Sequence, residues 1–192
     1  IWVATEPILG MGFKAPDGYT MATPLGEIAQ HADVSASFND MIIGLIPGSM
    51  GETSVIAIAI GAVILLWTGI ASWKTMLSVF LGGGLMAVVF EQLGMSSIPW
   101  YEHIVLGGFC FGAVFMATDP VTSARTESGK WVYGALIGIM AVVVRVMNPG
   151  YPEGMMLAIL FGNMFAPLID YCVVDRNISR RSKRGAQKNA NQ

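Results

Sequence analysis

A stretch of polar and turn-forming residues near the start of the chain has the spacing of a helix start. A turn is expected at Asp17 and Gly18, which follow a proline. Either Thr20 or Thr23 then caps a helix whose first residue is Pro24. The free N–H groups at a helix N-terminus also favour an anion such as a phosphate. The residue types alone therefore predict either an ordinary capped helix or a site that carries a phosphate.

Two acidic residues lie in apolar surroundings later in the chain. Asp170 lies inside the last apolar run, and Asp119 ends an earlier run just before Pro120. A carboxylate within the membrane costs roughly 2.5–3.5 kcal/mol on insertion scales, so both residues are candidates for a functional role. The alternatives are an Asp170 that pairs with a nearby arginine or lies near the interface, and an Asp119 that belongs to a helix C-terminal turn.

The other polar residues near the apolar runs have simpler interpretations. Arg145 lies near the end of an apolar run, and we expect its side chain to extend to the membrane surface. Glu91, Glu102 and His103 lie at a loop, where solvation alone explains them.

The composition indicates a membrane protein. Hydrophobic residues make up 54% of the 192 residues and charged residues only 12%, which excludes a soluble enzyme. A formal net charge of -2 excludes a nucleic-acid-binding protein, which needs a basic face. Cys110 and Cys172 lie far apart and form no Cys/His cluster, so the sequence predicts no metal site housed in this chain alone.

Apolar runs of helix length predict an all-α integral membrane fold with about five transmembrane helices. The first run is 21 residues long, which is enough to cross ~30 Å of hydrocarbon. Glycine pairs four residues apart, such as Gly134 and Gly138, predict close packing between helices. Residues 41–50 are apolar but broken by Pro47, which favours a re-entrant or interfacial piece. The five predicted spans are 53–73, 75–90, 104–118, 131–147 and 154–174.

The distribution of Lys and Arg predicts the orientation. Six of the 11 basic residues fall in 176–192, which places that end in the cytoplasm, and the loop 119–130 falls on the same side. Residues 1–52 hold one Lys and six acidic residues and are expected outside. The predicted division is an external segment (1–52) with the re-entrant or interfacial piece, a five-helix transmembrane bundle (53–175) and a basic cytoplasmic tail (176–192).

Three stretches resemble one family of membrane flavoproteins. They are 17–24 (Asp-Gly-Tyr-Thr-Met-Ala-Thr-Pro), 115–121 (Phe-Met-Ala-Thr-Asp-Pro-Val) and 166–171 (Ala-Pro-Leu-Ile-Asp-Tyr). The family comprises the B subunits of the sodium-translocating NADH:quinone oxidoreductases and the related D subunits of Rnf complexes. The D subunits share the first two patterns, and the basic tail favours the quinone reductase. The resemblance covers essentially the whole chain as the C-terminal half of such a protein, so we expect an N-terminal half of the same polypeptide as a partner.

The resemblance implies a covalent flavin. The acceptor is Thr23, which would hold FMN through a phosphoester to its hydroxyl. Met21 stands where the family has a small residue. The motif neighbours of the acceptor are Asp17, Gly18, Thr20 and Ala22.

The resemblance also implies an activity and a setting. The chain would pass electrons toward riboflavin and ubiquinone and couple this transfer to Na⁺ translocation, together with the other subunits of a redox complex. It would lie in a bacterial inner membrane, where a flavin transferase modifies Thr23 on the periplasmic side. The family fold is a pair of inverted five-helix repeats, as in urea-channel-like proteins, of which this chain matches one. Ion routes in such folds lie near the repeat interface, where Asp170 and Asp119 are candidates.

Three other functions remain open from the sequence. The chain could be the corresponding subunit of an Rnf-type ferredoxin:NAD oxidoreductase, which shares two of the motifs. A flavin-free channel or secondary transporter would explain the fold and the buried acids. A purely structural scaffold would leave Asp170 and the threonine motif without a role.

Overall fold

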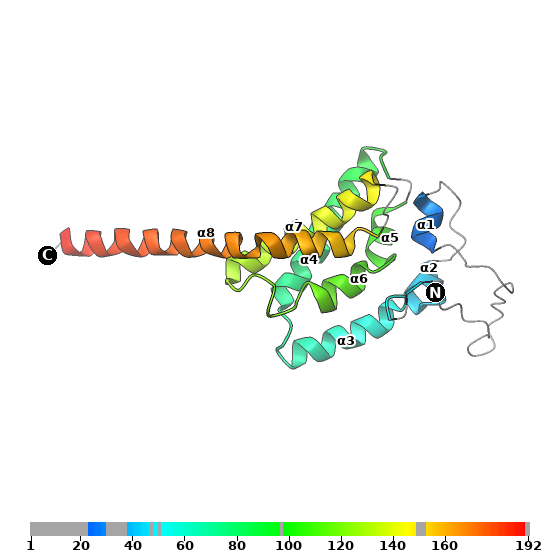
Figure 1. Cartoon of the computed structure of the whole chain (residues 1–192), viewed down its shortest axis with the longest axis horizontal. Coiled ribbons are helices and arrows are strands. Elements are labelled where there is room, and N and C mark those ends of the chain that lie inside the picture. The colour runs from blue at the N-terminus through cyan, green and yellow to red at the C-terminus, as the bar shows by residue number, and fades with distance from the viewer. Residues whose placement is uncertain are drawn as a thin grey trace.

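In the part of the chain that the structure describes, every regular secondary-structure element is a helix (Figure 1). The computed structural model describes residues 23–29, 38–46, 48–49, 51–96, 98–148 and 153–190, with the backbone alone for 27, 29 and 185–190. The elements are α1 (Pro24–Ala29), α2 (Phe38–Ile43), α3 (Val55–Trp67), α4 (Trp73–Gln92), α5 (Trp100–Val105), α6 (Phe109–Phe111), a π-helical turn η2 (Gly112–Met116), α7 (Glu127–Met147) and α8 (Met155–Ala190).

Three helices in the described part of the chain are long and apolar enough to cross a membrane. They are α4, α7 and α8, and they occupy the predicted spans 75–90, 131–147 and 154–174. Helix α8 has 36 residues and does not end with the apolar run, but continues through the basic residues and projects away from the bundle (Figure 1). The predicted boundary between bundle and tail at 175 is therefore a change of composition within one helix.

The first predicted span is shorter than its apolar run. Helix α3 has 13 residues, or ~20 Å, and ends at Trp67 although the apolar run continues. The Thr68 hydroxyl donates to the carbonyls of Ile64 and Leu65, and Gly69 then adopts a φ of +70°. These local bonds satisfy the last carbonyls of the helix, so the chain can turn there.

The third predicted span is not one continuous helix. Run 104–118 is divided among the end of α5, the short α6 and η2. The break lies at Leu106, which has an extended backbone, and at Gly107, whose φ of +65° is costly for any other residue. Because α3 is short and run 104–118 is broken, the predicted count of five spans is not confirmed.

The core forms where α7 packs between α4 and α8. At Gly138 an added Cβ would collide with the carbonyl oxygen of Val79, so the α4 and α7 backbones touch. The predicted close packing at this glycine pair is confirmed. Tyr133 and Ile137 are fully buried in the same cluster, together with Ile159 of α8. This packing fixes the relative positions of the three long helices and of the loops at their ends.

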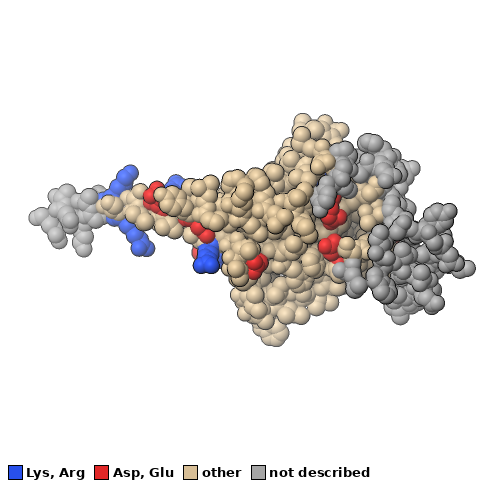
Figure 2. All heavy atoms as spheres, in the orientation of Figure 1, with Lys and Arg blue, Asp and Glu red and all other residues tan. Residues whose placement is uncertain are grey.

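Charged side chains are sparse across the middle of the molecule and gather toward its ends. Figure 2 shows a broad uncharged band over the bundle, with Lys and Arg concentrated toward the projecting part of α8. This distribution is typical of a protein whose middle lies in hydrocarbon.

Candidate functional site

Thr23 caps helix α1, as the spacing predicted. Its hydroxyl oxygen accepts a hydrogen bond from the backbone N–H of Gly26 at 3.2 Å, and Pro24 occupies the first helical position. The cap uses the oxygen as an acceptor, and the hydroxyl proton has no hydrogen-bond acceptor among the described residues. Thr23 is also exposed, so this hydroxyl is accessible to an attached group.

Leu25 anchors the segment that carries Thr23. Its side chain is only 3% exposed and packs in a small cluster with Met41, Ile98 and Leu106. The cluster joins α1 and α2 to the end of α5, so the exposed threonine is held by a buried neighbour two residues away.

A small cavity of about 50 Å³ lies directly beside Thr23. Its lining includes Thr23, Glu52, Gly107 and Glu153. Sites for drug-sized ligands usually enclose ~300–1,000 Å³. The cavity is therefore too small for the ring system of a flavin, and a group attached to Thr23 must lie mainly outside it.

The two glutamates of this cavity meet at the break between α5 and α6. The backbone N–H of Gly108 donates to Glu153 at 2.5 Å. A Cβ on Gly108 would lie 3.0 Å from a Glu153 oxygen and 3.1 Å from a Glu52 oxygen, so both carboxyl groups border the same backbone. Burial, and then the proximity of Glu153, raise the pKa of Glu52 above its usual range. The glutamates therefore add negative charge and a titratable group beside Thr23.

Arg145 also supports this break, and its predicted role was wrong. Its side chain does not extend to the membrane surface: the residue is only 7% exposed and donates to the carbonyls of His103 at 2.6 Å and Leu106 at 3.2 Å. The interpretation of His103 as a solvated loop residue was wrong too, because it is 3% exposed and lies 2.8 Å from the Ser96 hydroxyl. The helix end at Leu106 leaves carbonyls that need donors, and Arg145 provides them.

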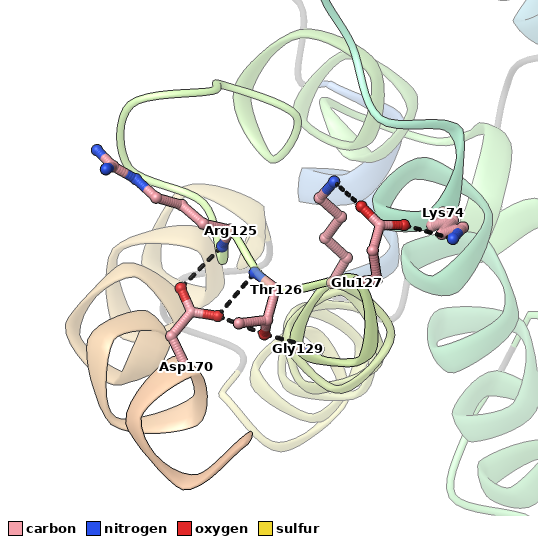
Figure 3. A network of polar contacts seen from close by, with 7 residues as sticks. Lys74, Arg125, Thr126, Glu127, Gly129 and Asp170 are labelled. Carbon is pink, nitrogen blue, oxygen red and sulfur yellow. Dashed lines mark hydrogen bonds and ion pairs between the residues drawn. The ribbon is translucent and has the colours of Figure 1, made fainter. Parts of the chain in front are cut away.

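Asp170 holds the start of helix α7. Its carboxylate accepts from the backbone N–H of Arg125 at 2.8 Å and from the N–H and hydroxyl of Thr126 at 3.0 and 2.6 Å (Figure 3). Thr126 is itself the cap of α7 and accepts from the N–H of Gly129. An anion at a helix N-terminus is stabilised by the free N–H groups and the helix dipole. Asp170 thus joins α8 to α7, and its role in an ion route stays a prediction.

Asp119 makes a local turn at the other end of the same loop. Its carboxylate accepts from the Thr122 hydroxyl at 2.7 Å and from the N–H groups of Val121 and Thr122. The Thr122 hydroxyl and these N–H groups hold the pKa of Asp119 below its usual range. Asp119 therefore stabilises the first turn of the loop 119–126, and Asp170 binds the last two residues of that loop.

Asn163, seven residues before Asp170 on α8, makes a second polar contact with α7. Its side-chain oxygen accepts from the Tyr133 hydroxyl at 2.5 Å and joins α8 to α7.

The two regions lie at different ends of the bundle. Glu153, beside Thr23, comes just before the start of α8, whereas Asp170 lies 15 residues into that helix, or ~22 Å along its axis. The predicted motif neighbours Asp17, Gly18, Thr20 and Ala22 lie outside the described residues. Among the residues that the structure describes, no group of three or more His, Cys, Asp or Glu side chains has a geometry that could hold a metal ion.

The chain matches one family of membrane proteins over nearly its whole length. The model of the NQR2, RnfD, RnfE family matches residues 1–179. Three similar proteins are each named as the B subunit of a Na(+)-translocating NADH-quinone reductase. The protein of Chromohalobacter salexigens is 54% identical over 181 residues, with 90% of this chain and 44% of the relative aligned. The protein of Klebsiella pneumoniae is 50% identical over 187 residues, which cover 90% of this chain and 45% of the relative. The protein of Pseudomonas aeruginosa is 49% identical over 178 residues, which cover 88% of this chain and 44% of the relative.

The chain spans less than half the length of these curated relatives. The resemblance seen in its motifs is confirmed by both comparisons. The chain belongs to the NQR2, RnfD, RnfE family of membrane proteins.

Proposed function

We propose that the chain is part of a membrane subunit of a sodium-pumping NADH:ubiquinone oxidoreductase and carries FMN on Thr23. The observation that carries this proposal is that Thr23 is exposed and that its hydroxyl oxygen caps α1 as an acceptor. Its proton is free to be replaced by a phosphoester while the oxygen keeps a lone pair for the cap. The names of the relatives support the enzyme class.

The residues around Thr23 fit a tethered flavin better than an enclosed one. The cavity of about 50 Å³ excludes the ring, so the covalent bond and the buried Leu25 would hold the group in place. The attached isoalloxazine would supply the electron chemistry, which side chains cannot perform. Glu52 and Glu153 would add negative charge beside it, which disfavours the more anionic, reduced flavin.

The remaining parts of the proposal follow the family. Electrons would pass toward riboflavin and ubiquinone, coupled to Na⁺ transport, with the N-terminal half of the polypeptide and other subunits as partners. Segment 1–52 would face the periplasm of a bacterial inner membrane, where a flavin transferase acts, and 176–192 would face the cytoplasm. Asp170 and Asp119 would serve the ion route.

Three substitutions at Thr23 separate flavin attachment from helix capping. Thr23→Ser keeps both the hydroxyl and the cap, Thr23→Asn keeps the cap without an esterifiable hydroxyl, and Thr23→Ala removes both. In the purified complex, flavin fluorescence on a denaturing gel should persist in the Ser variant and vanish in the other two. Thr20→Ala should leave flavin attached.

The mass of the peptide that contains Thr23 gives an independent measurement. In the wild type, we expect this peptide to be heavier than its sequence by the mass of an esterified FMN. In the Asn variant, we expect the mass of the unmodified peptide. Covalent flavin on this chain in the Asn variant would assign the attachment to another residue.

A further inference from the structure

A second and larger cleft lies between the turn that joins α3 to α4 and the loop that leads into α7. It encloses about 420 Å³ and is lined by residues 69–74 and by side chains from 118–130. The cleft is within the range of small-molecule sites, unlike the cavity beside Thr23. It lies at the end of the bundle where α4 and α7 begin.

The cleft carries a net positive charge. Lys74, Arg125 and Lys130 line it, against the single carboxylate of Glu127. Glu127 accepts from Lys74 and, at 2.7 Å, from Lys130, so these three side chains form one network. The Arg125 side chain is outside the network, and the lining therefore has a surplus of two positive charges.

The Arg125 guanidinium is available to an anion. It is exposed and donates no hydrogen bond within the described part of the chain, although the Asp170 carboxylate, which accepts from the Arg125 backbone N–H, also attracts it electrostatically. Figure 3 shows the guanidinium directed away from both Asp170 and the Glu127 network. A guanidinium has a planar set of N–H donors that matches two oxygens of a phosphate group. Because the backbone is held in place, an anion that binds the guanidinium has to order only the side chain.

Aromatic and apolar groups place the cleft at the membrane surface. Trp73, at the first position of α4, packs edge-on against Trp131 of α7 with the ring centroids 6.0 Å apart. Tryptophan is enriched at the boundary between headgroups and hydrocarbon. Ile70, which lines the cleft, is 58% exposed, and Trp67, two residues before the lining begins, is 88% exposed.

We propose that this cleft binds the phosphodiester headgroup of an anionic phospholipid. Arg125 contacts the phosphate, Lys74 and Lys130 supply further positive charge, and the acyl chains lie along the exposed apolar surface at Trp67 and Ile70. Basic pockets between transmembrane helices are a recurring site for such headgroups. A free anion would use the cations but not the apolar surface, which is why the lipid is favoured. The proposal does not depend on the flavin at Thr23.

The test compares lipid binding to the intact, purified complex and to three variants. Native mass spectrometry would measure the fraction of complex that retains dioleoylphosphatidylglycerol or dioleoylphosphatidylcholine at increasing lipid concentration. Arg125→Gln should weaken phosphatidylglycerol binding at one site by about tenfold, since it removes charge-assisted hydrogen bonds. Arg125→Lys should weaken it less, because it keeps the charge without the planar donors. Arg180→Gln is the matched control, since it removes one positive charge from an exposed position on α8 outside the cleft.

The outcomes separate the lipid from other anions. Selective loss of phosphatidylglycerol in the Arg125→Gln variant, with phosphatidylcholine and the Arg180→Gln complex unaffected, supports the proposal. Equal lipid retention in the Arg125→Gln variant and the wild type overturns it. Displacement of the lipid by millimolar inorganic phosphate also overturns it, because the cleft would then be a site for a free anion.

Discussion

Replacing Asp170 with alanine should destabilise the fold whether or not sodium is present. The carboxylate accepts three hydrogen bonds, two from backbone N–H groups and one from the Thr126 hydroxyl. Its removal leaves the cap of α7 without support and separates α8 from the loop at Arg125. We therefore expect an anchoring defect even if the residue also contacts the ion.

The three hydrogen bonds to Asp170 set the loss of stability that the substitution causes. A hydrogen bond to a charged group contributes about 1.5–3 kcal/mol, which gives an upper limit of ~5–9 kcal/mol for three. Water can reach the exposed Arg125 and replace part of this, and the three bonds share one carboxylate. We therefore expect a loss of about 2–4 kcal/mol, or roughly 4–16 °C in the thermal midpoint of a chain of this length.

The assay is the thermal midpoint of the purified complex, read by size-exclusion chromatography with a fluorescent fusion, with and without Na⁺. Asp175→Ala is the control, because Asp175 lies on the same helix, is exposed and is not a partner in the hydrogen bonds that join Asp170 to the start of α7. The anchoring role predicts a large loss for Asp170→Ala in both buffers and a small one for Asp175→Ala. An unchanged midpoint together with lost sodium activation would refute it and assign Asp170 to the ion route alone.

Two further changes test the region around Thr23. Arg145→Met should lower the stability of the complex by about 2–4 kcal/mol, because it leaves the carbonyls of His103 and Leu106 without donors; an unchanged thermal midpoint would contradict this. Glu52 has a raised pKa in the folded state, so the stability that it contributes is present below its unfolded pKa and is lost as the pH rises through the folded value. Glu52→Gln should therefore raise the thermal midpoint at pH 8 by no more than about 2 °C, and this gain should vanish near pH 4. A gain that grows toward acid pH would contradict the raised pKa of Glu52.

Local features of the fold could be predicted from the sequence. The cap at Thr23 depends on a threonine followed by proline, and both residues act within one turn. The three long helices lie at three of the five predicted apolar runs, and the contact at Gly138 follows from glycine spacing. The early end of α3 also has a local signal at Thr68 and Gly69, which hydropathy alone does not reveal.

Contacts between distant segments could not be predicted. Asp170 binds residues 44 and 45 positions earlier in the chain, and a carboxylate in an apolar run gives no sign of which loop reaches it. Arg145 is buried because α5 ends at Leu106, 39 positions away, where a carbonyl needs a donor. In a single sequence, a buried arginine with carbonyl partners has the same appearance as one that reaches the membrane surface.

The distance between the two ends of the bundle limits how an ion at Asp170 could affect a flavin at Thr23. Two unit charges ~22 Å apart interact by only ~0.8 kcal/mol at an effective dielectric constant of about 20. For a one-electron step this corresponds to ~30 mV. Asp170→Ala should therefore raise the midpoint potential of the flavin proposed at Thr23 by less than ~30 mV in a redox titration of the purified complex. Glu52→Gln, which removes negative charge from the cavity beside Thr23, should raise it more. A larger shift from Asp170→Ala than from Glu52→Gln would show that the two ends are joined by more than electrostatics, because only a movement of α8 or of the break at Gly107 could then carry the effect.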